Sequence, residues 1–186
     1  MTRFRPLPCI PVALTLCLLF ALLTLTACGY RMGAAPETPT TFGTLAVPIF
    51  VNLSPEPNIQ AVITGALIRE FHQAGVLIVG LDQADKILEG RVLGYTNRSL
   101  ARTAASTVSE YRLLVMVDLV VKDRAGKILF RNPSAQLREE YFASAVLEEN
   151  EIAEAEALKS GAVDFAQDQV RHILDGISAG LGNERL

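Results

Sequence analysis

The sequence predicts an α+β fold, a two-layer sandwich in which two helices pack on one face of a mostly antiparallel or mixed sheet of about four strands. Two segments repeat apolar residues at intervals of three and four, as helices with one buried face do. Residues 111–123 instead alternate, which is typical of a strand. The order along the chain is strand, helix, several strands and helix, as in α+β domains. We assign this domain to residues 43–180.

The first strand is predicted at residues 44–50 (TLAVPIF), where Pro48 indicates an edge position or a strand end because proline cannot donate to a ladder. A helix begins at Pro57 and ends at Gly75, since glycine commonly follows a last helical turn. Residues 76–80 form a short buried strand. One stripe of the helix is apolar: Ile59, Val62, Ile63, Ala66, Leu67 and Phe71.

A longer strand covers residues 86–100, and the clearest strand is 111–123, whose odd positions from Tyr111 to Val121 are all apolar. A turn ending at Gly126 joins it to a partner strand, so the two form a hairpin. Asn132-Pro133 predicts a bulge or kink in that partner, which resumes over residues 136–142.

The last helix is predicted from about Glu151, and residues 181–186 form a C-terminal tail. The inner side of this helix consists of apolar residues at helical spacing: Leu158, Ala162, Phe165, Ala166, Val170, Ile173 and Ile177. Seven acids and no base lie between Glu139 and Glu156. The macrodipole at the start of a helix favours negative charge, which explains this run without a ligand.

The N-terminal segment has the parts of a secretory signal. Arg3 and Arg5 form a basic start, an apolar stretch follows, and small residues precede Cys28. A transmembrane helix would need about 20 apolar residues. Pro11 shortens this run, and no basic cluster follows it. We therefore predict a signal peptide at residues 1–27, with an ordinary cleaved signal or an anchor helix as the alternatives to a lipoprotein signal.

The tetrapeptide Leu25-Thr26-Ala27-Cys28 resembles a bacterial lipobox. In proteins with this motif the cysteine sulfur takes a diacylglycerol, the signal is cut before the cysteine, and the freed amine is acylated. One acyl chain holds a protein marginally, whereas two or more anchor it stably. The resemblance implies that Cys28 carries a covalent lipid. Residue 29 is glycine rather than aspartate, so the inner-membrane retention signal of enteric bacteria is missing.

Residues 28–42 are predicted to be the acylated N-terminus and a tether, because the stretch GAAPETPTT is small, polar and proline-bearing. Without residues 1–27 the chain keeps 15 basic and 20 acidic residues, a net charge of −5, which argues against a nucleic-acid binder. Cys9 and Cys17 leave with the signal, so no internal disulfide and no cysteine-held metal are expected.

The second face of the predicted sheet is a candidate partner face. The even positions of the clearest strand include Leu114, Met116 and Val120, rimmed by charged residues. A face turned wholly to water would be more polar. Scattered surface apolar residues, or a loop folded over them, are the alternative.

Arg98 and Arg102 are candidate phosphate contacts, in a segment (NRSLARTAAST) predicted to be a loop. Guanidinium groups suit phosphate geometry, although a solvated loop is the other interpretation.

The sequence gives little support for a catalytic site. His72 and His172 lie within predicted helices, the carboxylates of Glu139 and Glu140 point to opposite faces of a strand, and no catalytic motif or phosphate-binding glycine loop is present.

Several motifs together resemble the LptE family. They are the lipobox joined to CGYR, then TLAVPIFVN, a helix running into GVLIV, ADKILEGRVLGY, and SEYRLLVMVDLVVKD with GKILF. The resemblance implies a non-enzymatic outer-membrane lipoprotein on the periplasmic side. It implies a plug and assembly factor inside an LptD-like β-barrel, aiding lipopolysaccharide transport, with Arg102 as a possible lipopolysaccharide contact. No cofactor beyond the lipid on Cys28 is implied. The alternative is a lipoprotein of another envelope machine, such as a secretion or cell-wall activator module.

Overall fold

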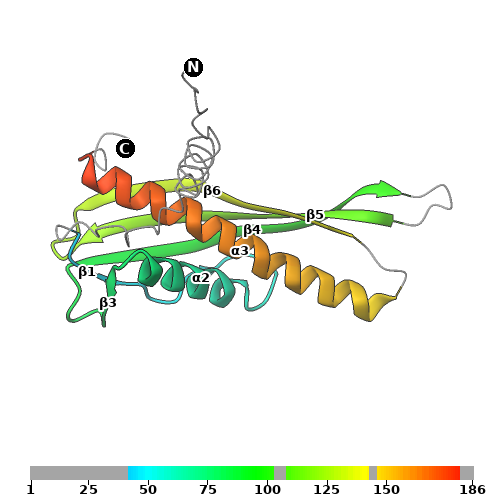
Figure 1. The fold of residues 1–186 in the computed structure, drawn as a ribbon, viewed down its shortest axis with the longest axis horizontal. Coiled ribbons are helices and arrows are strands. Elements are labelled where there is room, and N and C mark those ends of the chain that lie inside the picture. Colours follow the sequence, from blue (N-terminus) through cyan, green and yellow to red (C-terminus); the bar gives the residue numbers. More distant parts are fainter. Residues whose placement is uncertain (1–41, 103–107, 143–145, 181–186) are drawn as a thin grey trace, which may run out of the picture. The chain divides into compact units, whose positions relative to one another are not determined.

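A mixed six-stranded sheet and two helices make up the fold (Figure 1). The computed structural model describes residues 42–102, 108–142 and 146–180, with the backbone alone for 101, 102, 108 and 109. The strand order is β3-β1-β4-β5-β6, with β2 also paired to β4. The strands are β1 (Thr44–Ala46), β2 (Val51–Asn52), β3 (Leu77–Ile78), β4 (Lys86–Arg102), β5 (Val108–Asp123) and β6 (Ile128–Phe142).

The sheet has six strands rather than the predicted number of about four, and the segment with Pro48 forms two short strands instead of one. The chain leaves the sheet after Ala46 and returns as β2. Both pieces run parallel to β4, at different points along it. Strands β4 and β6 each run antiparallel to β5, which lies between them, so the sheet is mixed. The prediction of a strand end at Pro48 is confirmed.

Both helices lie on one face of the sheet, as predicted (Figure 1). Helix α2 (Ile59–Gln73) ends before Gly75, whose φ of 79° is in the left-handed region. Helix α3 (Leu147–Ser178) begins four residues earlier than predicted. Its first turn contains Glu148 and Glu149, which favour a helix start through the macrodipole. The odd positions of β5 form the centre of the core and are fully buried: Leu113, Val115, Val117, Leu119 and Val121.

The ring of Phe50 packs directly on the backbone of β4 at Gly90. A Cβ at Gly90 would lie 2.3 Å from two atoms of that ring, far closer than any van der Waals contact. Phe50 is buried, and its N–H donates to Oγ1 of Thr64 in α2 at 3.2 Å. The segment between β1 and β2 is thereby held between the sheet and the first helix.

The two edge strands of the sheet, β3 and β6, differ in length and in the side chains that they expose. Strand β3 was predicted to be buried, but the side chain of Leu77 is 63% exposed because β3 pairs only with β1 and forms an edge. Strand β6 forms the opposite edge, and its pairing with β5 shifts register beside Asn132-Pro133, which confirms the predicted bulge. Exposed charged side chains follow on β6, among them Arg138 and Glu140.

Asp85 holds the start of β4 to the start of β1. Its Oδ2 accepts the backbone N–H of Thr44 at 2.9 Å and the hydroxyl of Thr44 at 2.8 Å. The backbone N–H of Asp85 donates to Oγ1 of Thr44 at 2.9 Å. The two bonds that the carboxylate accepts from Thr44 hold the pKa of Asp85 below its ordinary value.

Asp85→Asn is therefore expected to lower the free energy of unfolding at pH 7. Because the folded-state pKa of Asp85 is depressed, the charge stabilises the fold above the unfolded-state pKa of about 3.9. That stabilisation is lost as pH falls through the lower folded-state pKa. Urea unfolding between pH 7 and pH 3 should show the wild-type advantage shrinking at the acid end, and Thr44→Val should weaken the same pH dependence. Parallel profiles for wild type and Asp85→Asn would contradict the assignment.

Candidate functional site

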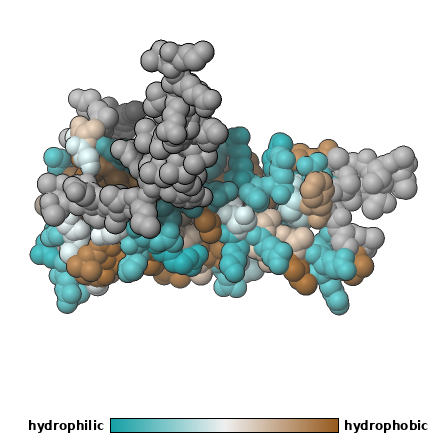
Figure 2. Space-filling view, viewed as in Figure 1, coloured by the Kyte–Doolittle hydropathy of each residue, from teal (hydrophilic) through white to brown (hydrophobic). Residues whose placement is uncertain are grey.

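The face of β4, β5 and β6 that points away from α2 and α3 is the candidate site, and we term it the open face. Its centre is the even-numbered row of β5, from Arg112 to Lys122. The predicted partner residues Leu114, Met116 and Val120 lie there, and all three are half-buried rather than fully exposed. In the view of Figure 2, which looks at the molecule from one side, hydrophilic residues cover most of the described surface and hydrophobic ones form separate patches.

Cations dominate this face. Six basic side chains share it by strand alternation with four acids, Glu89, Glu110, Asp118 and Glu140. The basic residues are Arg91, Arg98, Arg112, Lys122, Arg131 and Arg138. Helix α3, on the other side of the sheet, carries eight acids and only two bases, Lys159 and Arg171. The two faces of the domain therefore differ in the sign of their charge.

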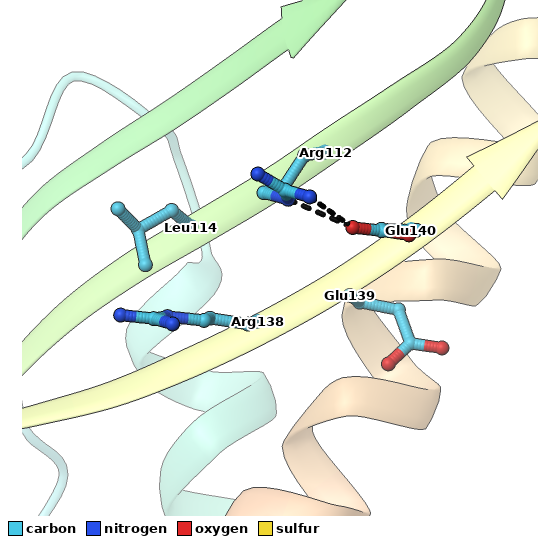
Figure 3. Close-up of a pocket in the computed structure, with 5 residues that line it drawn as sticks. All are labelled: Arg112, Leu114, Arg138, Glu139 and Glu140. Carbon is cyan, nitrogen blue, oxygen red and sulfur yellow. Dashed lines mark hydrogen bonds and ion pairs between the residues drawn. The ribbon is translucent and has the colours of Figure 1, made fainter. Parts of the chain in front are cut away.

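A cavity of about 670 Å³ opens at the β5–β6 pair of the open face (Figure 3), and we term it the Arg112–Arg138 hollow. It is lined by Arg112, Leu114, Arg138, Glu139 and Glu140. Nε and Nη2 of Arg112 donate to Oε1 of Glu140 at 2.8 and 2.5 Å. Arg138 donates instead to the amide oxygen of Gln136. In Figure 3 the side chain of Glu139 points away from the other four, toward α3.

Arg98 lies in strand β4, within the strand predicted at residues 86–100 and not in the loop to which NRSLARTAAST was also assigned. It is exposed and stands directly opposite Arg112 in the β4–β5 register. The strand continues through Arg102, whose side chain is outside the described residues. The structure thus places Arg98 beside the Arg112–Arg138 hollow.

Asp118 is the buried acid of the open face, with its side chain 3% exposed. Nη2 of Arg91 contacts Oδ2 of Asp118 at 2.5 Å, and Nε of Arg131 lies 3.6 Å from Oδ1. Oδ1 itself accepts no hydrogen bond. Asp118 lies where the β5–β6 register shifts, so the bulge lets guanidinium groups from both neighbouring strands reach one carboxylate.

A polar cluster lies on the helix side of the sheet, and sequence patterns gave no sign of it. Glu154 of α3 accepts the hydroxyl groups of Tyr95 and, at 3.3 Å, of Tyr141. Nδ2 of Asn97 donates to the hydroxyl of Tyr141 at 2.6 Å, and the ring of Tyr141 stacks on Tyr111 with centroids 5.4 Å apart. Burial is the main cause that raises the pKa of both Tyr95 and Tyr141. Because hydroxyl groups from β4 and β6 both donate to Glu154, the cluster fastens α3 to the sheet.

The part of the chain that the structure describes contains neither a metal-binding cluster nor a membrane-spanning helix. Those residues hold no group of three or more His, Cys, Asp and Glu side chains able to bind a metal ion. Neither α2 nor α3 combines the length and hydropathy that a membrane span requires. His72 and His172 are exposed on their helices. Cys28 lies outside the described residues.

Comparisons with known proteins give one family match and several similar folds. The family model described as LptE, Lipopolysaccharide-assembly, matches residues 42–173. The solution structure of uncharacterized lipoprotein B from Nitrosomonas europaea is 19% identical, with a TM-score of 0.51, and covers 75% of this chain and 87% of its own. A crystal structure from Xanthomonas campestris is 12% identical, with a TM-score of 0.52, and covers 77% and 91%. These structures show the fold alone. No curated protein matches the chain.

Proposed function

Because the chain belongs to the LptE family of lipopolysaccharide-assembly proteins, a non-enzymatic lipoprotein family, we propose that it is the plug and assembly partner of an LptD-like outer-membrane β-barrel. In this role it is anchored by a lipid on Cys28 to the periplasmic side of the outer membrane. It helps lipopolysaccharide pass through the barrel and enter the outer leaflet.

The observation that carries the proposal is the extent of the family match. Residues 42–173 contain every strand of the sheet, all of α2 and most of α3. The match therefore covers the whole sheet, including the open face, and not a single motif. A sheet with one face packed under helices and the other left open suits a protein that works by contact.

Two groups of side chains fit this role. Leu114, Met116 and Val120 offer apolar surface to a barrel wall, since each is half-buried on the open face. Arg98 is exposed at the edge of that surface, and Arg102 follows it on the same strand. Guanidinium groups bind phosphate with two parallel hydrogen bonds, so we propose this pair as contacts for the phosphates of lipopolysaccharide.

The test is the composition of the purified barrel. From cells that express both proteins, an affinity-tagged barrel is expected to retain this chain in equal amount. Recovery of the barrel without the chain would overturn the proposal. Capture of a secretion or cell-wall machine by the tagged chain, with surface lipopolysaccharide unchanged on depletion, would favour the other envelope role.

Cys28→Ser is expected to release the mature chain from the membrane. The anchor needs the cysteine sulfur, and acyl chains contribute about 0.8 kcal/mol for each buried CH₂ group. Fractionation of cells followed by immunoblotting measures the distribution. Cys17→Ser is the matched control, because it changes a cysteine within the predicted signal and should leave the chain membrane-bound. Equal membrane association of all three chains would rule out Cys28 as the anchor.

A further inference from the structure

We propose that the Arg112–Arg138 hollow binds an extended segment of a partner protein that carries a carboxylate two residues from an apolar side chain. The carboxylate pairs with Arg138, and the apolar side chain packs on Leu114. The inference deepens the proposed function and rests on it, because the barrel is the partner that would supply the segment.

The charges around the hollow are incompletely paired. Among the described residues, neither Arg98 nor Arg138 forms an ion pair with a carboxylate. Arg98 stands directly opposite Arg112, and like charges in that position are destabilising. Arg112 has one acidic partner, Glu140. An incoming carboxylate would relieve this excess of positive charge, and the fork of Arg138 can bind it with two hydrogen bonds.

One extended segment can reach both Arg138 and Leu114, because the long side chain of Arg138 adapts to the position of its ligand. Arg138 and Leu114 are directly opposite in the β5–β6 register, and Met116 follows Leu114 on the same face. An extended segment places its residues i and i+2 on one face about 6.6–6.8 Å apart. A segment lying across the hollow can therefore present an acid to Arg138 and an apolar residue to the half-buried Leu114.

The acid at the hollow favours a carboxylate over a phosphate. Glu140 holds its carboxylate there beside Arg112, whereas the side chain of Glu139 points toward α3, and a doubly charged phosphate would be repelled by Glu140. A single carboxylate next to an apolar group experiences less repulsion and also uses the apolar surface of Leu114. The chemistry of the hollow thus suits a polypeptide better than a phosphorylated lipid headgroup.

The experiment uses the full-length, lipid-anchored chain in cells that also make the barrel. Arg138→Glu is expected to reduce the barrel recovered with the tagged chain at least about tenfold, as charge reversal in a paired site does. The Arg138→Lys variant should retain most of the barrel that the wild-type chain recovers. Arg171→Glu, the same charge change at an exposed position on α3, should have no effect. Circular dichroism melting of the purified chains verifies that each variant is folded.

A photocrosslinking residue in place of the exposed Gln136, beside Arg138, identifies what occupies the hollow. A crosslink to the barrel, mapping to a segment with an acid and an apolar residue two apart, is the expected result. If the barrel still co-purifies with Arg138→Glu, or if position 136 captures only lipopolysaccharide or nothing, the inference is overturned and the proposed function stands. If the wild-type chain retains no barrel, the proposed function fails and the inference falls with it.

Discussion

Gly90→Ala is expected to lower the free energy of unfolding by about 2–3 kcal/mol, because a single added methyl group overfills a packed site. The new Cβ would lie 2.3 Å from atoms of the Phe50 ring, and this ring is buried between β4 and α2. The backbone of Phe50 cannot move away from β4 without breaking the hydrogen bond from its N–H to Oγ1 of Thr64. Urea unfolding monitored by circular dichroism measures the loss.

Gly94→Ala is the matched control for that prediction. Gly94 lies on the same strand, and a Cβ there would meet no atom within 4 Å. Alanine at this position should leave stability unchanged or slightly increased, since glycine within a strand is unfavourable. Phe50→Leu should recover part of the stability lost in Gly90→Ala, because the smaller side chain makes room. Equal effects of Gly90→Ala and Gly94→Ala would contradict the packing argument.

Arg91→Ala is expected to cost about 2 kcal/mol, because it leaves the buried Asp118 carboxylate with Arg131 alone at 3.6 Å. Removing one partner of a fully buried pair costs about 3–5 kcal/mol. The effect is smaller here because Arg91 is 53% exposed, and solvent screens part of the interaction. The free energy of unfolding in urea is again the measurement.

A double-mutant cycle separates the ion pair from the packing of the Arg91 side chain. Asp118→Asn removes the buried charge, so Arg91→Ala should cost clearly less in that background than in the wild type. Arg171→Ala removes a cation from the surface of α3 and should change stability by no more than about 0.5 kcal/mol. Additive losses from Arg91→Ala and Asp118→Asn would show that the two side chains are not energetically coupled.

Much of the fold was predictable because its strongest signals are periodic. The alternation of β5 and the stripe of α2 each reflect burial against the sheet–helix interface, and both predictions are confirmed. Pro48 correctly predicted the end of a strand. The surrounding sequence did not show that the chain would then pair with β4 a second time, as β2. Strands β1 and β3 lie within the predicted segments 44–50 and 76–80, whereas β2 was not recognised as a separate strand because its two residues carry too little periodicity.

The candidate site was predictable only in part, because its residues meet through pairing between strands. The alternation of β5 put Leu114, Met116 and Val120 on one face, and the structure places them there. The meeting of Leu114 with Arg138 depends on the β5–β6 register, and a bulge shifts that register further along the pair. The predicted strand ended at residue 100, yet pairing with β5 extends β4 through Arg102. The bond between Tyr95 and Glu154 joins residues 59 positions apart, and no local pattern reports it.

The bulge and the charges of β6 also determine how the chain behaves when many copies are crowded together. An uncharged, apolar edge strand without a bulge would pair with the same strand of a neighbouring molecule. Repeated pairing of this kind builds a fibril. Pro133 has no N–H to offer to such a growing ladder, and the like charges of Arg131 and Arg138 would face an incoming copy. These features of β6 therefore oppose self-templated aggregation through this edge of the sheet.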